Sequence, residues 1–73
     1  MTKVILYTKD GEAFKVTPAF KRNKVKAGYG KVFMMNPYGR YVPIFDAIPL
    51  TMAEEMFSNF EKREIEEADI YER

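Results

Sequence analysis

The chain of 73 residues contains no cysteine and no histidine. Without cysteine it can form neither a disulfide framework nor a thiolate centre, which fits a reducing compartment. Without histidine it lacks a common ligand for zinc and copper and the commonest general base. The remaining acids form no arguable carboxylate dyad. We therefore expect no metal site, no cofactor and no catalytic residues, and we interpret the protein as one that is not an enzyme.

Long apolar runs are absent as well. No stretch approaches the roughly 18 consecutive apolar residues that a membrane-spanning helix needs, and the first apolar run covers only residues 4–7. We therefore expect no membrane association and no secretion signal, and we predict a cytoplasmic location. At 8.6 kDa the chain is near the size at which one hydrophobic core is only just sufficient. We expect a single domain and a monomer.

The sequence predicts a first β-hairpin near the N-terminus. Residues 3–9 and 12–17 are rich in β-branched and aromatic side chains and are separated by Asp10 and Gly11, a strong two-residue hairpin signal. This loop pairs Tyr7 with Phe14. One face of the hairpin is then predicted to be core, made of Ile5, Tyr7, Phe14 and Val16. Pro18 cannot donate to a strand ladder, so we expect the second strand to end there.

A second hairpin is predicted around Asn36-Pro37-Tyr38-Gly39. Pro37 suits a type I turn and Gly39 suits a bulge that needs positive φ. With Asn36 opposite Arg40, the strands pair Met35 with Tyr41, Met34 with Val42 and Val32 with Ile44. The face predicted to be core carries Val32, Met34, Val42 and Ile44. The opposite face is expected either to pack against the protein or to bind a partner, and it carries Lys31, Phe33, Met35, Tyr41 and Phe45.

Residues 19–30 are predicted to be a basic loop, in which Val25 could add a short third strand at a sheet edge. Thr51 and Glu54 fit a capping box, so we expect a helix to begin at Thr51 and to reach Arg63. Its apolar stripe is Ala53, Met56, Phe57 and Phe60. The predicted fold class is α+β: a small antiparallel sheet of four or five strands from two β-hairpins, with one C-terminal helix packed on it. We divide the chain into a domain of residues 1–63 and an acidic, frayed tail of residues 64–73.

The net charge of +1 conceals an uneven distribution along the chain. Residues 1–41 carry nine Lys and Arg against two acids, a charge of +7, whereas residues 42–73 carry three against nine acids, a charge of −6. Such a division bears on partners and on association rates. It predicts a molecule with one basic and one acidic side.

The candidate binding residues are cations with aromatic residues between them. Phosphate-neutralising lysines and exposed rings are typical of surfaces that hold nucleic acid, although a nucleic-acid binder is expected to be basic overall. Arg and Tyr are also common anchors of protein interfaces. The residues are Lys21, Arg22, Lys24, Lys26, Tyr29, Lys31, Arg40 and Tyr41. The structural alternative is a solvated loop beside ordinary sheet aromatics. The methionines at 34, 35, 52 and 56 are interpreted as core, with an adaptable binding surface as the alternative.

In its length, its lack of Cys and His and its charge distribution, the chain resembles the small phage-encoded transcription regulators that bind RNA polymerase. The resemblance implies a protein that contacts a large subunit of bacterial RNA polymerase and inhibits initiation, with antitermination as a further effect. It carries no residue assignments, because no motif is shared. Our functional hypothesis is therefore a non-enzymatic regulator of transcription, and the alternative is a small nucleic-acid-binding protein that uses its basic N-terminal half.

Overall fold

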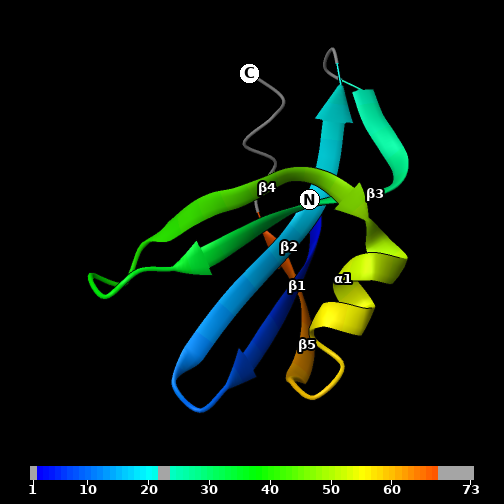
Figure 1. Ribbon diagram of the computed structural model, residues 1–73. Helices are drawn as coiled ribbons and strands as arrows, with labels where there is room; N and C mark the ends of the chain where they lie inside the picture. The colour runs from blue at the N-terminus through cyan, green and yellow to red at the C-terminus, as the bar shows by residue number, and fades with distance from the viewer. Residues whose placement is uncertain (1, 22–23, 68–73) are drawn as a thin grey trace.

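The structure, a computed structural model, describes residues 2–21 and 24–67 (Figure 1). Its elements are β1 (Thr2–Lys9), β2 (Glu12–Lys21), β3 (Lys24–Met35), β4 (Tyr41–Pro49), α1 (Leu50–Met56) and β5 (Glu61–Glu67). The five strands form one antiparallel sheet in the order β4-β3-β2-β1-β5. An antiparallel sheet with one helix is what the sequence predicted. The strand content is higher than expected, and the helix is shorter.

The first hairpin is confirmed in its turn and in its register. Asp10 and Gly11 have φ angles of 49° and 85°, as a two-residue turn that matches the strand twist requires. Tyr7 pairs with Phe14, and Ile5 pairs with Val16. Tyr7 and Val16 are buried in the core, while Ile5 and Phe14 pack against it.

The predicted end of the second strand at Pro18 is wrong, and so is the predicted loop of residues 19–30. β2 continues through Pro18 to Lys21, and β3 begins at Lys24. The register shifts between Pro18 and Phe20, and at such a bulge the missing N–H of proline costs no ladder hydrogen bond. Val25 belongs to β3, where it pairs with Phe20, and is not a separate edge strand.

The turn of the second hairpin is also confirmed. The N–H of Gly39 donates to the carbonyl of Asn36 at 3.0 Å, and Gly39 has φ 82°. The Asn36 side chain closes the loop, because its Oδ1 accepts from the backbone N–H groups of Tyr38 and Arg40, both at 3.0 Å. Met35 pairs with Tyr41, and Met34 pairs with Val42, as predicted.

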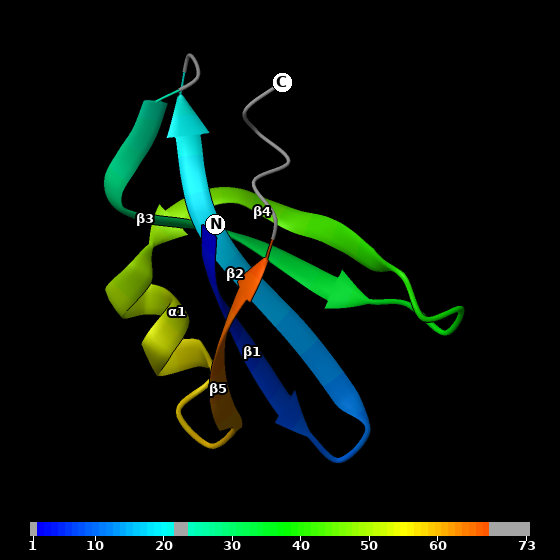
Figure 2. The same cartoon turned by 180° about the vertical axis from the view of Figure 1, so that it is seen from behind.

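The predicted pair of Val32 with Ile44 is wrong, because β4 contains two irregularities. Val32 pairs with Phe45, and Gly30 pairs with Ile48. Between the Phe33–Pro43 pair and the Val32–Phe45 pair, β4 contains one residue more than β3, and it gains a second extra residue before the Gly30–Ile48 pair. Extra residues of this kind bend a strand and increase its twist. Figures 1 and 2 show β4 as an arch that leads into α1.

The predicted core face of this hairpin is therefore only partly correct. Val32 is fully buried, but three other residues expected in the core are exposed: Met34, Val42 and Ile44. Met52 and Met56 of α1 are exposed too, so the interpretation of these methionines as core is wrong. The helix contributes Ala53, and the residue after it, Phe57, joins the same cluster.

The helix prediction was correct in place and wrong in detail. α1 begins at Leu50 with Pro49 as N-cap and has no side-chain cap hydrogen bond, so the Thr51 capping box does not form. α1 ends at Met56, and residues 61–67, which were divided between the helix and the tail, form β5 beside β1. Residues 68–73 of the predicted tail lie outside the described residues. Within the described part, the one helix has seven residues, too short to cross a bilayer.

Candidate functional site

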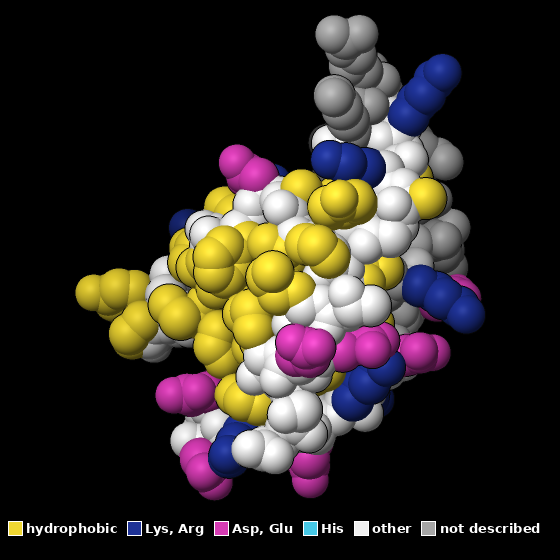
Figure 3. Space-filling view, turned by 45° about the vertical axis from the view of Figure 1, so that its right-hand side comes forward, with side chains coloured by type: hydrophobic (Ala, Val, Ile, Leu, Met, Phe, Trp, Pro, Cys, Tyr) yellow, Lys and Arg dark blue, Asp and Glu magenta, His cyan; other side chains and the backbone are white. Residues whose placement is uncertain are grey.

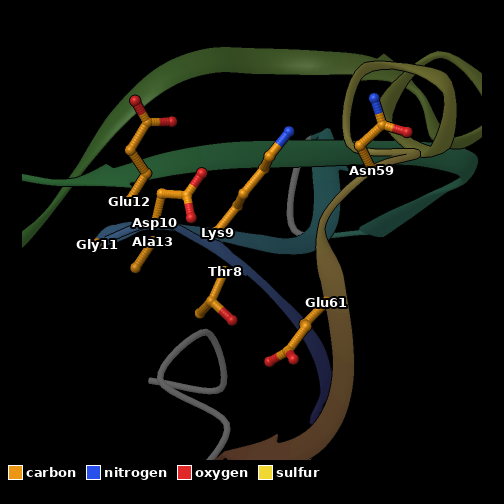
Figure 4. A pocket seen from close by; sticks show the side chains of 8 residues that line it. All are labelled: Thr8, Lys9, Asp10, Gly11, Glu12, Ala13, Asn59 and Glu61. Carbon is orange, nitrogen blue, oxygen red and sulfur yellow. The ribbon is translucent and has the colours of Figure 1, made fainter.

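A polar hollow of about 460 Å³ lies beside the β1–β2 turn (Figure 4). Its charged lining residues are Lys9, Asp10, Glu12 and Glu61. Figure 4 shows Glu61 set apart from the two carboxylates at the turn, so the acids do not converge on one point. Among residues 2–21 and 24–67 no group of three acids is placed to hold a metal ion. The hollow offers neither a paired nucleophile and base nor a closed pocket for a substrate.

The face of the sheet opposite α1 carries a cluster of cations and rings, which we call the lysine–aromatic cluster: Lys15, Lys31, Phe33 and Tyr41. The Lys15 ammonium lies 4.8 Å from the ring centre of Tyr41 and 5.3 Å from that of Phe33. Lys31 lies 5.4 Å from the Phe33 ring. Lys15 also forms an ion pair of 3.3 Å with Glu67 at the end of β5. The cluster therefore joins β2, β3, β4 and β5.

The eight predicted binding residues do not form one site. Lys31 and Tyr41 meet in the lysine–aromatic cluster, and Arg40 is exposed beside them at the start of β4. Lys24 and Lys26 are exposed in the first part of β3, where the Lys26 ammonium lies 4.2 Å from the ring centre of Tyr29. Arg22 and the side chain of Lys21 lie outside the described part of the chain.

Lys26 and Tyr29 belong to the rim of an apolar pocket of about 280 Å³. The pocket lies beside the first turn of α1. Its apolar lining is Ile5, Val16, Pro18, Val25 and Leu50, and Lys3 and Glu64 complete the charged rim. Its volume is just below the range of pockets that hold drug-sized ligands, and it is large enough for one large side chain.

Two residues of these surfaces were missed by the sequence reasoning. Lys15 was unassigned because its contacts with Phe33 and Tyr41 depend on the pairing of β2 with β3, which the sequence did not predict. Tyr38 was read only as part of a turn. It is 88% exposed at the tip of the second hairpin, and the middle position of a type I turn points its side chain to solvent.

The uneven charge of the sequence does not divide the molecule into a basic and an acidic side. β5, which carries four of the nine described acids, lies beside β1, where Glu66 is opposite Lys3. Glu67 also pairs with Lys15 of β2. The acidic segment therefore neutralises part of the basic N-terminal half. Exposed cations of the described residues are spread over β1 (Lys3, Lys9), β3 (Lys24, Lys26), the second turn (Arg40) and β5 (Lys62, Arg63).

A continuous apolar area covers the α1 side of the β3–β4 hairpin (Figure 3). We call it the apolar surface and define it by six side chains that are 37% to 48% exposed: Met34, Val42, Ile44, Phe45, Met52 and Met56. The register places Met34, Val42 and Phe45 on the same face as buried Val32. Met52 and Met56 are four residues apart and share one flank of α1. The other flank carries Glu54. Burial raises the pKa of Tyr7 of β1, and the negative charge of Glu54 helps to raise it.

The segment that supplies five of the six side chains of this surface carries acids and no cations. Residues 41–60, which build β4, α1 and the turn after it, contain Asp46, Glu54 and Glu55 and no Lys or Arg. Figure 3 shows acidic side chains along the lower border of the apolar area. Comparisons of this chain with protein-family models, with curated protein sequences and with solved structures found no match.

Proposed function

We propose that this chain is a non-enzymatic regulator that works by binding a protein, and that the partner belongs to the transcription machinery. Bacterial RNA polymerase, through a large subunit, is the first candidate, with inhibition of initiation and antitermination as the effects. The choice of polymerase is based on the resemblance in size and charge distribution. The cytoplasm is the corresponding location, and the free protein is taken to be a monomer.

The exposed apolar surface is the observation that carries the proposal of protein binding. Each of its six residues is more than a third exposed, and contiguous apolar patches of a few hundred Å² mark interaction sites on small proteins. In a chain of 73 residues, large apolar side chains are needed for the core, so leaving six of them half exposed is costly. The hairpin adds Arg40 and Tyr38, which are exposed residues of the types that anchor interfaces.

Affinity capture of polymerase subunits from a bacterial lysate tests the proposal. The wild type is compared with an Arg40→Ala, Tyr38→Ala variant and with the matched control Val25→Ala, which changes an exposed residue at the far end of β3. An Arg40→Ala, Tyr41→Ala variant asks in addition whether the lysine–aromatic cluster takes part. Capture of polymerase subunits by both the wild type and the control variant would support the proposal. Failure of the wild type to retain polymerase above background would contradict the choice of partner.

The second candidate function is nucleic-acid binding through the cations of β3. Lys24 and Lys26 are exposed on one strand, and Lys31 and Arg40 follow on the same hairpin. Binding through these residues would weaken linearly on a log–log plot against salt, with a slope that reports the phosphates neutralised. Anisotropy titrations with single- and double-stranded DNA and RNA at low salt test this. Absence of binding at micromolar protein concentration would contradict nucleic-acid binding as the function.

A further inference from the structure

We propose that the apolar surface receives a basic amphipathic helix of the protein partner. This inference depends on the proposed function, since it names the kind of segment by which a protein partner docks. It takes up the alternative that Met34, Met52 and Met56 form an adaptable binding surface, and it adds Val42, Ile44 and Phe45 to that surface. The occupant follows from three features of the surface: its charge, its backbone and its side chains.

The charge around the surface favours a basic occupant. Asp46 of β4 and Glu55 of α1 are exposed, and residues 41–60, which supply five of the six side chains, contain no cation. Arg40, the exposed cation nearest in sequence, precedes them at the hairpin turn. A second copy docked by the same face would bring these acids against their own counterparts across a two-fold axis, which costs free energy. A nucleic-acid backbone would be repelled in the same way. A segment with lysines or arginines beside its apolar residues is complementary.

The backbone of β4 argues against an occupant that adds a strand. β4 is at the edge of the sheet, but Pro43 lacks an N–H and two register shifts interrupt the strand. Prolines and bulges are devices that block edge pairing. An extended peptide would therefore leave part of its backbone without partners. A helix satisfies its own backbone hydrogen bonds and needs only side-chain contacts.

The side chains of the surface suit a helix of variable sequence. Three of the six are methionines: Met34, Met52 and Met56. The unbranched, polarizable methionine side chain adapts its shape to different apolar partners. Val42, Ile44 and Phe45 supply the less flexible part of the surface next to them. The exposed area is smaller than one side of a standard interface, about 800 Å². We therefore expect moderate affinity in which the basic residues of the occupant matter.

The probe for the test is a 16-residue synthetic helix with leucines at positions i, i+4, i+7 and i+11 and lysines flanking that stripe. Two control peptides accompany it, one with each lysine replaced by glutamate and one with the same residues in scrambled order. Binding is measured by amide chemical shifts of the isotope-labelled full chain and by the helicity that the peptide gains. The basic helix should shift amides of α1 and of residues 42–46, and both controls should bind at least about tenfold more weakly.

Protein variants then locate the site. Met52→Asn with Met56→Asn changes two exposed residues and should weaken binding of the basic helix at least about tenfold. Asp46→Asn with Glu55→Gln should weaken it by a smaller factor and reduce its salt dependence. Val25→Asn is the matched control, because Val25 is 60% exposed and lies outside the apolar surface, and it should bind as the wild type. Thermal melts establish that each variant remains folded.

Three results would overturn the inference: shifts confined to the first half of β3, equal affinity for the acidic peptide, or a dimer in sedimentation that the methionine variant converts to monomer. Polymerase capture separates this inference from the proposed function. If the wild type and the folded methionine variant retain polymerase equally, the function stands and the docking surface is wrong. If neither retains it while the basic helix binds as expected, the surface stands and the partner is wrong.

Discussion

The rings of Tyr7 and Phe57 stack with their centroids 4.7 Å apart and their planes 25° from parallel. Phe57 follows the last residue of α1 and also contacts Phe14 of β2, at 4.8 Å between ring centroids. The short helix is therefore attached to the sheet by an aromatic side chain just beyond its C-terminus. Since α1 has no side-chain cap, this packing is the main source of its stability.

Replacing Phe57 by Ala should remove this attachment. We expect a loss of about 3 to 5 kcal/mol in the free energy of unfolding, which for so small a domain approaches the total. Urea unfolding followed by circular dichroism measures it. Tyr38→Ala, at an 88% exposed position, should change stability by less than about 0.5 kcal/mol. A loss below about 1 kcal/mol for Phe57→Ala would mean that the aromatic cluster does not hold the helix.

Gly30 is required by a close approach between β3 and α1. A Cβ at this position would lie 2.8 Å from Cδ2 of Leu50 and 2.8 Å from Cγ1 of Val16. Gly30→Ala should therefore destabilise the fold by about 1 to 3 kcal/mol. Adding Leu50→Ala should recover part of the loss, because it removes one of the two clashes. Additive effects of the two substitutions, measured by a double-mutant cycle, would show that Gly30 and Leu50 do not meet.

Thr51→Ala should not destabilise the protein. A helix that began with Thr51 as N-cap would lose about 0.5 to 2 kcal/mol in this variant. In the structure Thr51 is an exposed residue inside α1, where alanine is the better helix former by roughly 0.5 kcal/mol. We expect an unchanged or slightly higher melting temperature. A clear decrease in the melting temperature would show that Thr51 caps the helix, as the sequence predicted.

Local turn signals were sufficient to predict both hairpins. Asp10-Gly11 and Asn36-Pro37-Tyr38-Gly39 set their own geometry through positive φ and through the Asn36 side chain, so no distant part of the chain is needed. The register next to each turn follows from the turn. It fails from Ile44 on, where β4 takes extra residues to bend toward α1. The bend leads β4 into α1. The alternation of side chains along a strand does not encode such a bend.

The C-terminal strand could not be predicted from local sequence. Residues 61–67 contain four Glu, one Lys and one Arg, which favour helix, yet all seven pair with residues 2–8 of β1. An edge strand with unpaired backbone groups is a strong partner, and Ile65 opposite Val4 adds one apolar pair. The candidate surfaces depend on long-range pairing as well. The lysine–aromatic cluster needs the pairing of β2 with β3 and of β3 with β4, which brings Lys15 to Phe33 and Tyr41, and the apolar surface combines side chains of β3, β4 and α1.

Tyr7 should make stability depend on pH in the alkaline range. The pKa of its hydroxyl is raised above the ordinary 10.0, first because burial disfavours the phenolate and second because of the negative charge of Glu54. An unfolded chain releases this proton near pH 10.0, whereas the folded protein retains it to higher pH. Above the unfolded pKa the folded state binds more protons than the unfolded state, so the free energy of unfolding falls as pH rises.

We expect the contribution of Tyr7 to be fully present below pH 10.0 and to be lost as pH rises through the folded pKa. The slope of this loss is at most about 1.4 kcal/mol per pH unit. Lysines ionise in the same range, so the informative quantity is the difference between wild type and Tyr7→Phe in urea unfolding from pH 8 to about pH 11. Tyr38→Phe should follow the wild-type curve, and Glu54→Gln should fall less steeply. Parallel curves for wild type and Tyr7→Phe would show that burial of the hydroxyl does not limit alkaline stability.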